Sequence, residues 1–212
     1  MAADTVPAAE RAYAYTKDMI VRGELPGGTL LSEGRICEEL GLSRTPVHEA
    51  FLRLATEQLL ELSSRRGAVV RPMAPHEAED VLELREAIET TAIARLLRTG
   101  GPGADALGAW RALLDEQRRH VAAGDIQAFV AADDALHTAI VAAAGNPIAA
   151  HVLGLLRDRQ QRLRRQYLRI VPEHLELGLE DHVRLVDALA AGDGPAATAV
   201  LSDHLSRYRG AL

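Results

Sequence analysis

From residue 76 to residue 210 the sequence has apolar residues at helical spacing and no alternating pattern of the kind that strands show. Glycine and proline interrupt this periodicity repeatedly and divide the stretch into six segments. The predicted helices cover residues 76–98, 104–123, 125–144, 147–170, 173–191 and 195–210. Amphipathic helices joined by short loops bury their apolar faces against one another, so the segment predicts an all-α antiparallel bundle of about six helices.

The first 72 residues have a different pattern, with short helical segments followed by two short apolar runs. Helices are expected at about residues 7–22, 32–41 and 43–57, and a hairpin at residues 60–63 and 68–71. Ser32 and Ser43 are predicted N-caps, and Gly41-Leu42-Ser43 gives two of these helices the spacing of a helix-turn-helix. The hairpin would add a wing, so the segment predicts a winged helix-turn-helix.

The segment Arg71-Pro72-Met73-Ala74-Pro75 separates the two patterns, because each proline pushes the preceding residue out of helical geometry. We therefore expect a winged helix-turn-helix domain at residues 1–72, a linker at 73–75 and a second, helical domain at 76–212. The predicted fold class is mainly α, a winged helix-turn-helix followed by the helical bundle.

Composition excludes several classes of protein. The 212 residues include a single cysteine, Cys37, which cannot form an internal disulfide or a cysteine-rich zinc site. No apolar stretch approaches the roughly 20 residues that span a bilayer, and residues 1–10 lack the pattern of a signal peptide. We expect a cytoplasmic protein with no membrane partner.

The helix predicted after Ser43 carries candidate DNA contacts, although the chain as a whole has a net charge of −6. Residues 43–72 hold five arginines and three glutamates. The predicted buried face consists of Val47, Ala50, Phe51 and Leu54. The exposed first turns present Arg44, Thr45 and His48, where a recognition helix meets base edges, and Ser43 suits a phosphate. Further candidates are Arg53 on the helix and Arg65 and Arg66 at the hairpin tip. A solvated charged face is the alternative.

The stretches Gly27–Glu33 and Leu40–Leu54, followed by Gln58-Leu59-Leu60, resemble the N-terminal domain of GntR-family bacterial transcription regulators over about residues 11–72. The resemblance adds Arg35 and the wing glycine Gly67 to the candidate DNA contacts. The family usually has arginines where this sequence has Gly34 and His48. Because histidine donates fewer hydrogen bonds than guanidinium, we expect weaker phosphate contacts or a different operator.

Polar residues lie on the apolar faces of three bundle helices. Asp133 and His137 are four residues apart on one such face, and His182 and His204 lie on apolar faces of the last two predicted helices. One carboxylate and three imidazoles in a bundle core could hold a divalent metal ion. Each histidine is individually more typical of a satisfied core residue, and His120 and His151 also border apolar faces, so periodicity alone does not select the set.

Residues 76–210 are similar to the FCD ligand-binding domain of FadR-like GntR regulators, in which an Asp-x-x-x-His motif precedes two histidines on the last two helices. Leu84-Arg85-Glu86-Ala87-Ile88-Glu89 and Gly145-Asn146 add to the resemblance, whereas Leu136 replaces a frequent phenylalanine. The resemblance implies that Asp133, His137, His182 and His204 bind a divalent metal ion, with zinc expected first and nickel or manganese as alternatives.

Arg85 is the candidate effector-binding residue. It is predicted on the inward face of its helix with Val81, Leu84 and Ile88, where an unpaired guanidinium is costly. One interpretation is an internal salt bridge to Glu89 or Asp134. The other is a bidentate clamp on a small carboxylate effector whose remaining oxygens reach the metal.

The combined prediction is a ligand-responsive bacterial transcription regulator, and a repressor is expected. Its partners would be double-stranded operator DNA with an inverted repeat, a small carboxylate and a second copy of the chain, since one half-site is too short for genomic specificity. One alternative is a DNA-binding regulator with a purely structural metal. Another is a metal-dependent hydrolase, but no residue has an identifiable spacing for a general base, so we do not expect an enzyme.

Overall fold

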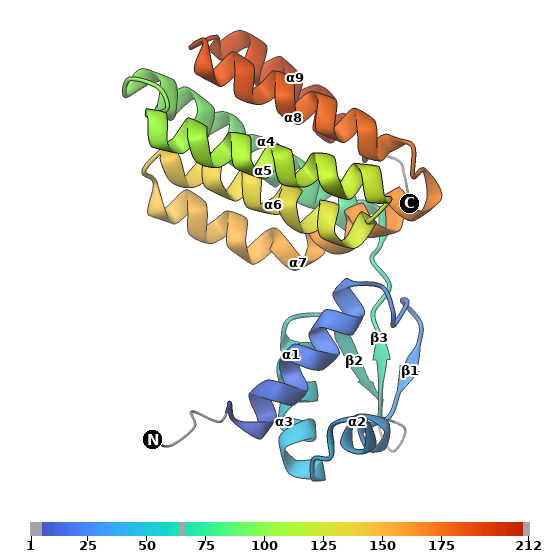
Figure 1. Ribbon diagram of the computed structural model, residues 1–212. Coiled ribbons are helices and arrows are strands. Elements are labelled where there is room, and N and C mark those ends of the chain that lie inside the picture. The colour runs from blue at the N-terminus through green and yellow to red at the C-terminus, as the bar shows by residue number, and fades with distance from the viewer. Residues whose placement is uncertain (1–5, 64–66, 210–212) are drawn as a thin grey trace, which may run out of the picture. The chain divides into compact units, whose positions relative to one another are not determined.

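The computed structural model describes residues 6–63 and 67–209, and the chain divides into two compact units, residues 1–73 and 74–212 (Figure 1). The first unit contains three helices and a small antiparallel sheet, and the second is entirely helical over its described residues. The predicted fold class is confirmed. Each unit is described below by itself.

The N-terminal unit is a winged helix-turn-helix. Its elements are α1 (Ala8–Val21), β1 (Leu30–Leu31), α2 (Glu33–Leu40), α3 (Arg44–Thr56), β2 (Leu60–Ser63) and β3 (Gly67–Val70). The predicted buried face of α3 is confirmed: it packs into a core that includes Ile20 of α1 and Ile36 of α2. Burial of this apolar face leaves the opposite side of α3 in solvent.

The short strand β1 was not expected from the sequence. It pairs with β3, which also pairs with β2, so the strand order is β1-β3-β2. Gly67 makes this pairing possible, because a Cβ at Gly67 would lie 2.3 Å from the carbonyl oxygen of Leu31. Gly67 also has a φ of 97°, which L side chains rarely adopt. Gly67 therefore has a packing role in the wing.

Capping residues define where the two helices of the helix-turn-helix begin and end. The Ser32 side chain accepts a hydrogen bond from the Arg35 amide, so the predicted cap is confirmed. Gly41 ends α2 in the left-handed conformation with a φ of 63°. Ser43 occupies the N-cap position of α3, but its side chain makes no capping hydrogen bond; the expected Ser43 cap is wrong in this respect. The Ser43 backbone is extended, and Ser43 is exposed to solvent.

The C-terminal unit contains six helices, as the periodicity predicts. They are α4 (Pro75–Arg98), α5 (Ala104–Ala123), α6 (Ile126–Ala143), α7 (Pro147–Ile170), α8 (His174–Ala190) and α9 (Gly194–Ser206). The last helix ends at Ser206, earlier than the predicted residue 210. In Figure 1 α5, α6 and α7 lie side by side, and α8 packs along α9. The helix α6 also contacts α4, so its inward side chains reach the middle of the bundle.

The helix α6 is long and apolar enough to cross a membrane by length and composition. Half of it is buried inside the bundle, and two of its buried residues, Asp133 and Asp134, are acidic. These properties are typical of the core helix of a soluble protein.

Candidate metal centre and DNA-reading helix

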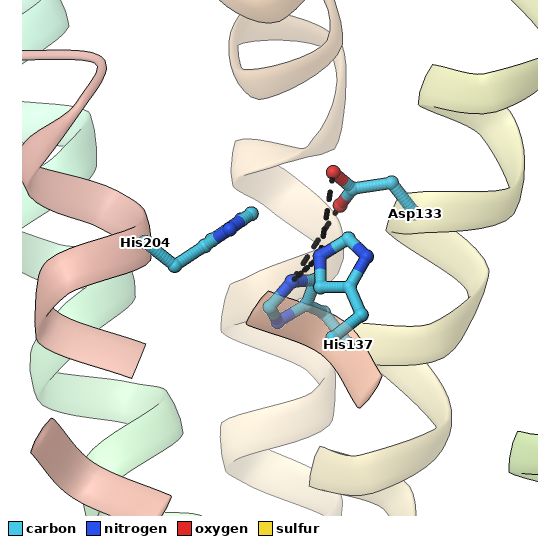
Figure 2. A group of neighbouring side chains, drawn as sticks. Asp133, His137 and His204 are labelled. Carbon is cyan, nitrogen blue, oxygen red and sulfur yellow. Dashed lines mark hydrogen bonds and ion pairs between the residues drawn. The ribbon is translucent and has the colours of Figure 1, made fainter. Parts of the chain in front are cut away.

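Asp133 and His137 lie one turn apart on α6 and point toward His204 of α9 (Figure 2). His182 of α8 completes the group, and all four side chains are buried. Each side chain offers one ligand atom, and these atoms lie within 4.8 Å of one another. The structure thus brings together all four residues of the predicted metal set.

The ligand atoms face one another across short distances. The Nε2 atoms of His137 and His182 are 3.2 Å apart. The Nε2 of His137 is 3.5 Å from one carboxylate oxygen of Asp133, and the Nε2 of His182 is 3.7 Å from the other. The ring centroid of His204 lies 4.6 Å from that of His182 and 5.3 Å from that of His137.

The Nδ1 atoms of the three histidines face oxygen atoms outside the cluster. Nδ1 of His137 lies 2.5 Å from a carboxylate oxygen of Glu89, and Nδ1 of His204 lies 3.5 Å from Asp181. Nδ1 of His182 lies 2.6 Å from Oε1 of Gln117. The Glu89 and Gln117 oxygens are within hydrogen-bond distance, so they orient the rings of His137 and His182 and favour a proton on Nδ1, which leaves the Nε2 lone pairs for a ligand. Nδ1 of His204 makes no hydrogen bond to a described residue.

The His137–His182 pair shows why a cation fits this centre. The amide nitrogen of Gln117 donates to the carbonyl oxygen of Ala132, so its Oε1 accepts from His182 and places the proton on Nδ1. The Glu89 carboxylate accepts in the same way from His137. Two Nε2 lone pairs then face each other in a buried space. A divalent cation held by these residues would convert this repulsion into coordination.

The protonation states also suit a metal. Burial lowers the pKa of His182 and of His204 well below 6.5, with further contributions from neighbouring cationic groups, so both are neutral imidazoles at neutral pH. Burial raises the pKa of Asp133 to about 6, although His137 and Arg85 oppose this shift. Burial also disfavours ionised Glu89, but the charges of Arg85 and His137 outweigh it and lower the pKa of Glu89 to about 2.

Two buried arginines adjoin the cluster. Arg85 of α4 pairs through Nε with Glu89, and its Nη2 lies 3.9 Å from Asp133. Arg164 of α7 pairs through Nη1 with the same carboxylate oxygen of Asp133. Both Nη atoms of Arg85, and Nε and Nη2 of Arg164, are buried without a hydrogen-bond partner among the described residues. Buried guanidinium nitrogens of this kind can bind an anionic ligand.

The structure corrects two details of the Arg85 prediction. Leu84 does not share the inward face, because its side chain is 51% exposed, and the adjacent Arg85 is rotated about 100° around the helix into the core. Of the two expected salt-bridge partners, Glu89 pairs with Arg85. Asp134 instead pairs with Arg157 and accepts a hydrogen bond from Gln161.

The other two candidate histidines are outside the centre. His151 is exposed on α7, and His120 is half-buried near Glu116 on α5. Sequence reasoning missed Arg164 and Gln117. Arg164 lies in an arginine-rich stretch of α7 in which many arginines have similar spacing, whereas Gln117 occupies an apolar-face position of α5 between Leu114 and the half-buried Val121. A polar residue on such a face was the available signal for Gln117.

The N-terminal end of α3 presents the candidate DNA contacts to solvent. Ser43, Arg44, Thr45 and His48 are all exposed. Nδ1 of His48 lies 2.7 Å from Glu33 of α2, which leaves its Nε2 for an outside partner. An exposed helix start that carries an arginine and hydroxyl groups suits base edges and phosphates.

The remaining candidate DNA contacts differ in whether the structure describes them and in which residues they contact. Arg35 pairs with Glu39 on the same helix. Arg53 pairs with Glu10, and its guanidinium carbon lies 3.5 Å from the ring centroid of Tyr13, so Arg53 links α3 to α1. Arg65 and Arg66 lie outside the described residues. A DNA contact by any of these residues stays a prediction.

A winged helix-turn-helix followed by a helical bundle with a buried polar centre defines a DNA-binding transcription regulator. The chain belongs to the gntR family of bacterial regulatory proteins, because the model of that family matches residues 8–70 and the FCD domain model matches residues 80–207. GntR regulators bind operator DNA, and this family consists of transcription regulators and not of enzymes.

Curated relatives and solved structures agree with this family. A "probable D-xylose utilization operon transcriptional repressor" of Paenarthrobacter nicotinovorans is 30% identical over 89% of this chain and 81% of its own length. The transcriptional repressor RspR of Escherichia coli is 26% identical over 95% of this chain and 87% of its own length. A GntR regulator from Rhodococcus sp. RHA1, 24% identical, has the same fold with a TM-score of 0.80 and covers 96% of this chain and 98% of its own.

Proposed function

We propose that this protein is a cytoplasmic repressor whose affinity for operator DNA is controlled by a small carboxylate bound at the buried metal centre. The observation that carries the proposal is the position of two arginines, some of whose nitrogens have no hydrogen-bond partner among the described residues, beside a cluster of four ligand atoms. These two features are the complementary parts of a site for an anionic chelator.

Asp133, His137, His182 and His204 would hold a divalent cation, with zinc expected first and nickel or manganese as alternatives. The bound ion would supply Lewis-acid coordination positions for the oxygens of a ligand. On this chain, Gln117 and Glu89 orient two of the imidazoles, and Arg164 orients the Asp133 carboxylate.

Charge balance supports an anionic effector. Within the centre the carboxylates of Glu89 and Asp133 offset the guanidinium groups of Arg85 and Arg164. A divalent cation would therefore leave uncompensated positive charge in a buried space, which is costly. A carboxylate ligand compensates this charge and can accept hydrogen bonds from the free nitrogens of both arginines.

The DNA-binding part of the proposal rests on α3. Arg44 and Thr45 would contact base edges in the major groove, while Ser43 and His48 would contact the backbone or neighbouring bases. A homodimer would place two such helices on the half-sites of an inverted repeat.

The helix α4 would couple the two activities. It carries Arg85 and Glu89 in the centre, and its first residue, Pro75, is the last residue of the predicted linker at residues 73–75. An effector that draws Arg85 toward itself would shift α4 and bias the arrangement of the two DNA-binding units, and release from the operator is the expected result.

Calorimetry with zinc-loaded protein and a panel of mono-, di- and hydroxycarboxylates tests the proposal. We expect at least one of these acids to bind the loaded protein, to bind more weakly after chelation, and to weaken operator binding in fluorescence anisotropy. Unchanged operator affinity at saturating ligand would reject the sensing mechanism. A metal that stabilises the fold while no acid binds would favour a purely structural ion.

A further inference from the structure

We propose that Asp181 is the positioning residue of His204: when the centre binds its metal ion, the Asp181 carboxylate accepts a hydrogen bond from Nδ1 of His204 and holds the ring with Nε2 toward the ion. The inference rests on the metal centre of the proposed function. It adds to the four ligand candidates a carboxylate that lies outside their set.

His204 is the imidazole of the centre whose ring is least fixed by its neighbours. The ring extends from α9 toward Asp133 and His137 (Figure 2). The side chain is 2% exposed, and neither ring nitrogen has a hydrogen-bond partner among the described residues. A neutral imidazole has one N–H donor and one acceptor, and burying both unpaired is costly. A metal ion bound at Nε2 would satisfy the acceptor, and the N–H at Nδ1 would still need an oxygen.

Asp181 of α8 has an oxygen at this place. Its Oδ2 lies 3.5 Å from Nδ1 of His204, and Oδ2 also has no hydrogen-bond partner among the described residues. The Asp181 residue is 2% exposed, so water does not replace the missing partner. The separation is slightly longer than the roughly 3 Å of a normal hydrogen bond, so a small rotation of the His204 ring would close it. A buried donor and a buried acceptor, both unpaired, therefore lie next to each other.

The helix α8 directs two adjacent side chains to different parts of the centre. Asp181 and His182 are neighbours in the sequence, so their side chains point about 100° apart around the helix. The helix packs against both α5 and α9. His182 contacts Gln117 of α5, and Asp181 lies beside His204 of α9. One turn of α8 thus carries one candidate ligand and the oxygen partner of another.

Two arginines hold the Asp181 carboxylate in place. Arg207, at the C-terminal end of α9, donates to Oδ1 over 3.0 Å, and Nη1 of Arg184 lies 3.6 Å from the same oxygen. Nη2 of Arg207 is also 3.0 Å from Oδ2 but makes no hydrogen bond to it. These positive charges offset the cost of burying the carboxylate. Asp181 is therefore held through Oδ1, and Oδ2 stays available to His204.

With Asp181, each of the three imidazoles has an oxygen partner outside the ligand set, as Glu89 and Gln117 provide for the other two. Such a partner fixes which ring nitrogen carries the proton, orients the ring and makes the metal-facing nitrogen more basic. A carboxylate does so more strongly than an amide. Because Arg207 offsets the charge of Asp181, the charge balance that favours an anionic effector is unchanged.

A double-mutant cycle in the full chain tests the pairing. Competition with a chromophoric chelator measures zinc affinity for the wild type, D181A, H204A and the double variant D181A/H204A. D181A should weaken zinc binding by about 10–100-fold. In the H204A background the same change should have no further effect, because Asp181 acts only through His204. D187A, which removes an exposed carboxylate from the same helix, is the matched control and should bind zinc like the wild type.

Nuclear magnetic resonance gives a second readout that a purely structural role of Asp181 would not change. In zinc-loaded protein with ¹⁵N-labelled histidine, the Nδ1 proton of His204 should give a slowly exchanging signal, assigned through correlations within the ring. D181A should lose this signal. D181N keeps the shape and an acceptor oxygen, so it should retain the signal and part of the zinc affinity. Circular dichroism confirms the folding of each variant.

The outcomes separate this inference from the function on which it rests. Equal zinc affinity in the wild type and D181A would overturn the role of Asp181 and leave the metal centre standing. A loss in D181A that persists in full in the H204A background would show that Asp181 acts independently of His204, and would overturn the role as well. The Nδ1 signal decides the question independently of the zinc affinity of H204A. A wild type that binds no zinc would reject the metal centre itself, and this inference with it.

Discussion

Nε2 of His137 and Nε2 of His182 face each other at 3.2 Å in the bundle core, while the opposite ring nitrogen of each contacts Glu89 or Gln117. When each ring carries its proton on Nδ1, neither Nε2 atom has a proton to share with the other. The arrangement is stable only when the pair binds a cation or when one ring takes up a proton against the cost of burial.

Metal removal should lower the stability of the C-terminal unit. At a free zinc concentration one hundred times the dissociation constant, binding should add about 2.7 kcal/mol to the free energy of unfolding. Trp110 of α5 is buried and is the only tryptophan, so its fluorescence reports the unfolding of this unit. H182A should lose the zinc-dependent increase in melting temperature, whereas the exposed-site control H151A should keep it. An equal zinc response in H182A would contradict the assigned ligands.

The Gln117 contact should tune metal affinity without supplying a ligand. In Q117M the side chain keeps a similar length but cannot accept the hydrogen bond from Nδ1 of His182. We expect metal affinity to fall by about 10–100-fold, as for other residues that orient metal-bound histidines. Competition with a chromophoric chelator measures this change. Q117E, which retains an acceptor, serves as the control, and equal losses in both variants would indicate a packing defect instead.

Arg164 should discriminate effector binding from metal binding. Replacing it by methionine removes the buried Nε and Nη2 atoms that have no partner among the described residues and preserves the volume of the side-chain stem. For the acid identified by calorimetry, R164M and R85M should each weaken binding by about 100-fold, because hydrogen bonds to charged groups contribute about 1.5–3 kcal/mol each.

Zinc binding to R164M should remain measurable by the same chelator competition. R157M, on the exposed side of α7, is the matched control and should bind the acid normally. Full acid affinity in both R164M and R85M would show that the effector lies elsewhere.

Arg44 should contribute specifically to operator recognition. R44A should weaken operator binding by about 1–3 kcal/mol and relax the preference at one base position of each half-site, if its guanidinium reads a base edge. Anisotropy titrations with single-base operator variants measure both effects. E49A, an exposed change on the same helix, is the control. A uniform loss on all sequences would reassign Arg44 to the phosphate backbone.

The N-terminal unit should lose stability in acid through Glu57. Burial disfavours the charged form, but hydrogen bonds from Lys17 and Tyr13 outweigh it and hold the pKa of Glu57 below its usual value of 4.5. Because the folded pKa is lowered, the ionised carboxylate stabilises the unit above pH 4.5, and this contribution is lost as the pH falls through the folded pKa.

Hydrogen exchange of α1 and α3 measures this effect in the intact chain. Between about pH 6 and pH 3 protection should decrease more in the wild type than in E57Q, which has no carboxylate to titrate. E49Q is the matched control on the solvent side of α3 and should follow the wild type. Identical pH profiles for E57Q and the wild type would contradict the assigned role of Glu57.

The sequence by itself determined the helices, their principal caps and the order of the two units. These features depend on neighbours a few residues apart: the apolar spacing of α6, the Ser32 cap and the left-handed Gly41 are all local properties. The resemblance to known families then selected four ligand candidates that periodicity left among several histidines.

Only the tertiary structure decided which polar side chains converge. His151 and His182 both border apolar faces in the sequence, but one is exposed and the other lies 3.2 Å from His137. Arg164 has several arginine neighbours on α7, yet only the way α7 packs in the bundle places the Arg164 guanidinium against Asp133. Likewise, β1 exists because it pairs with β3, nearly 40 residues later. The rotation and offset of each packed helix or strand depend on many contacts between residues far apart in the sequence. No pattern of neighbouring residues predicts the combined result of these contacts.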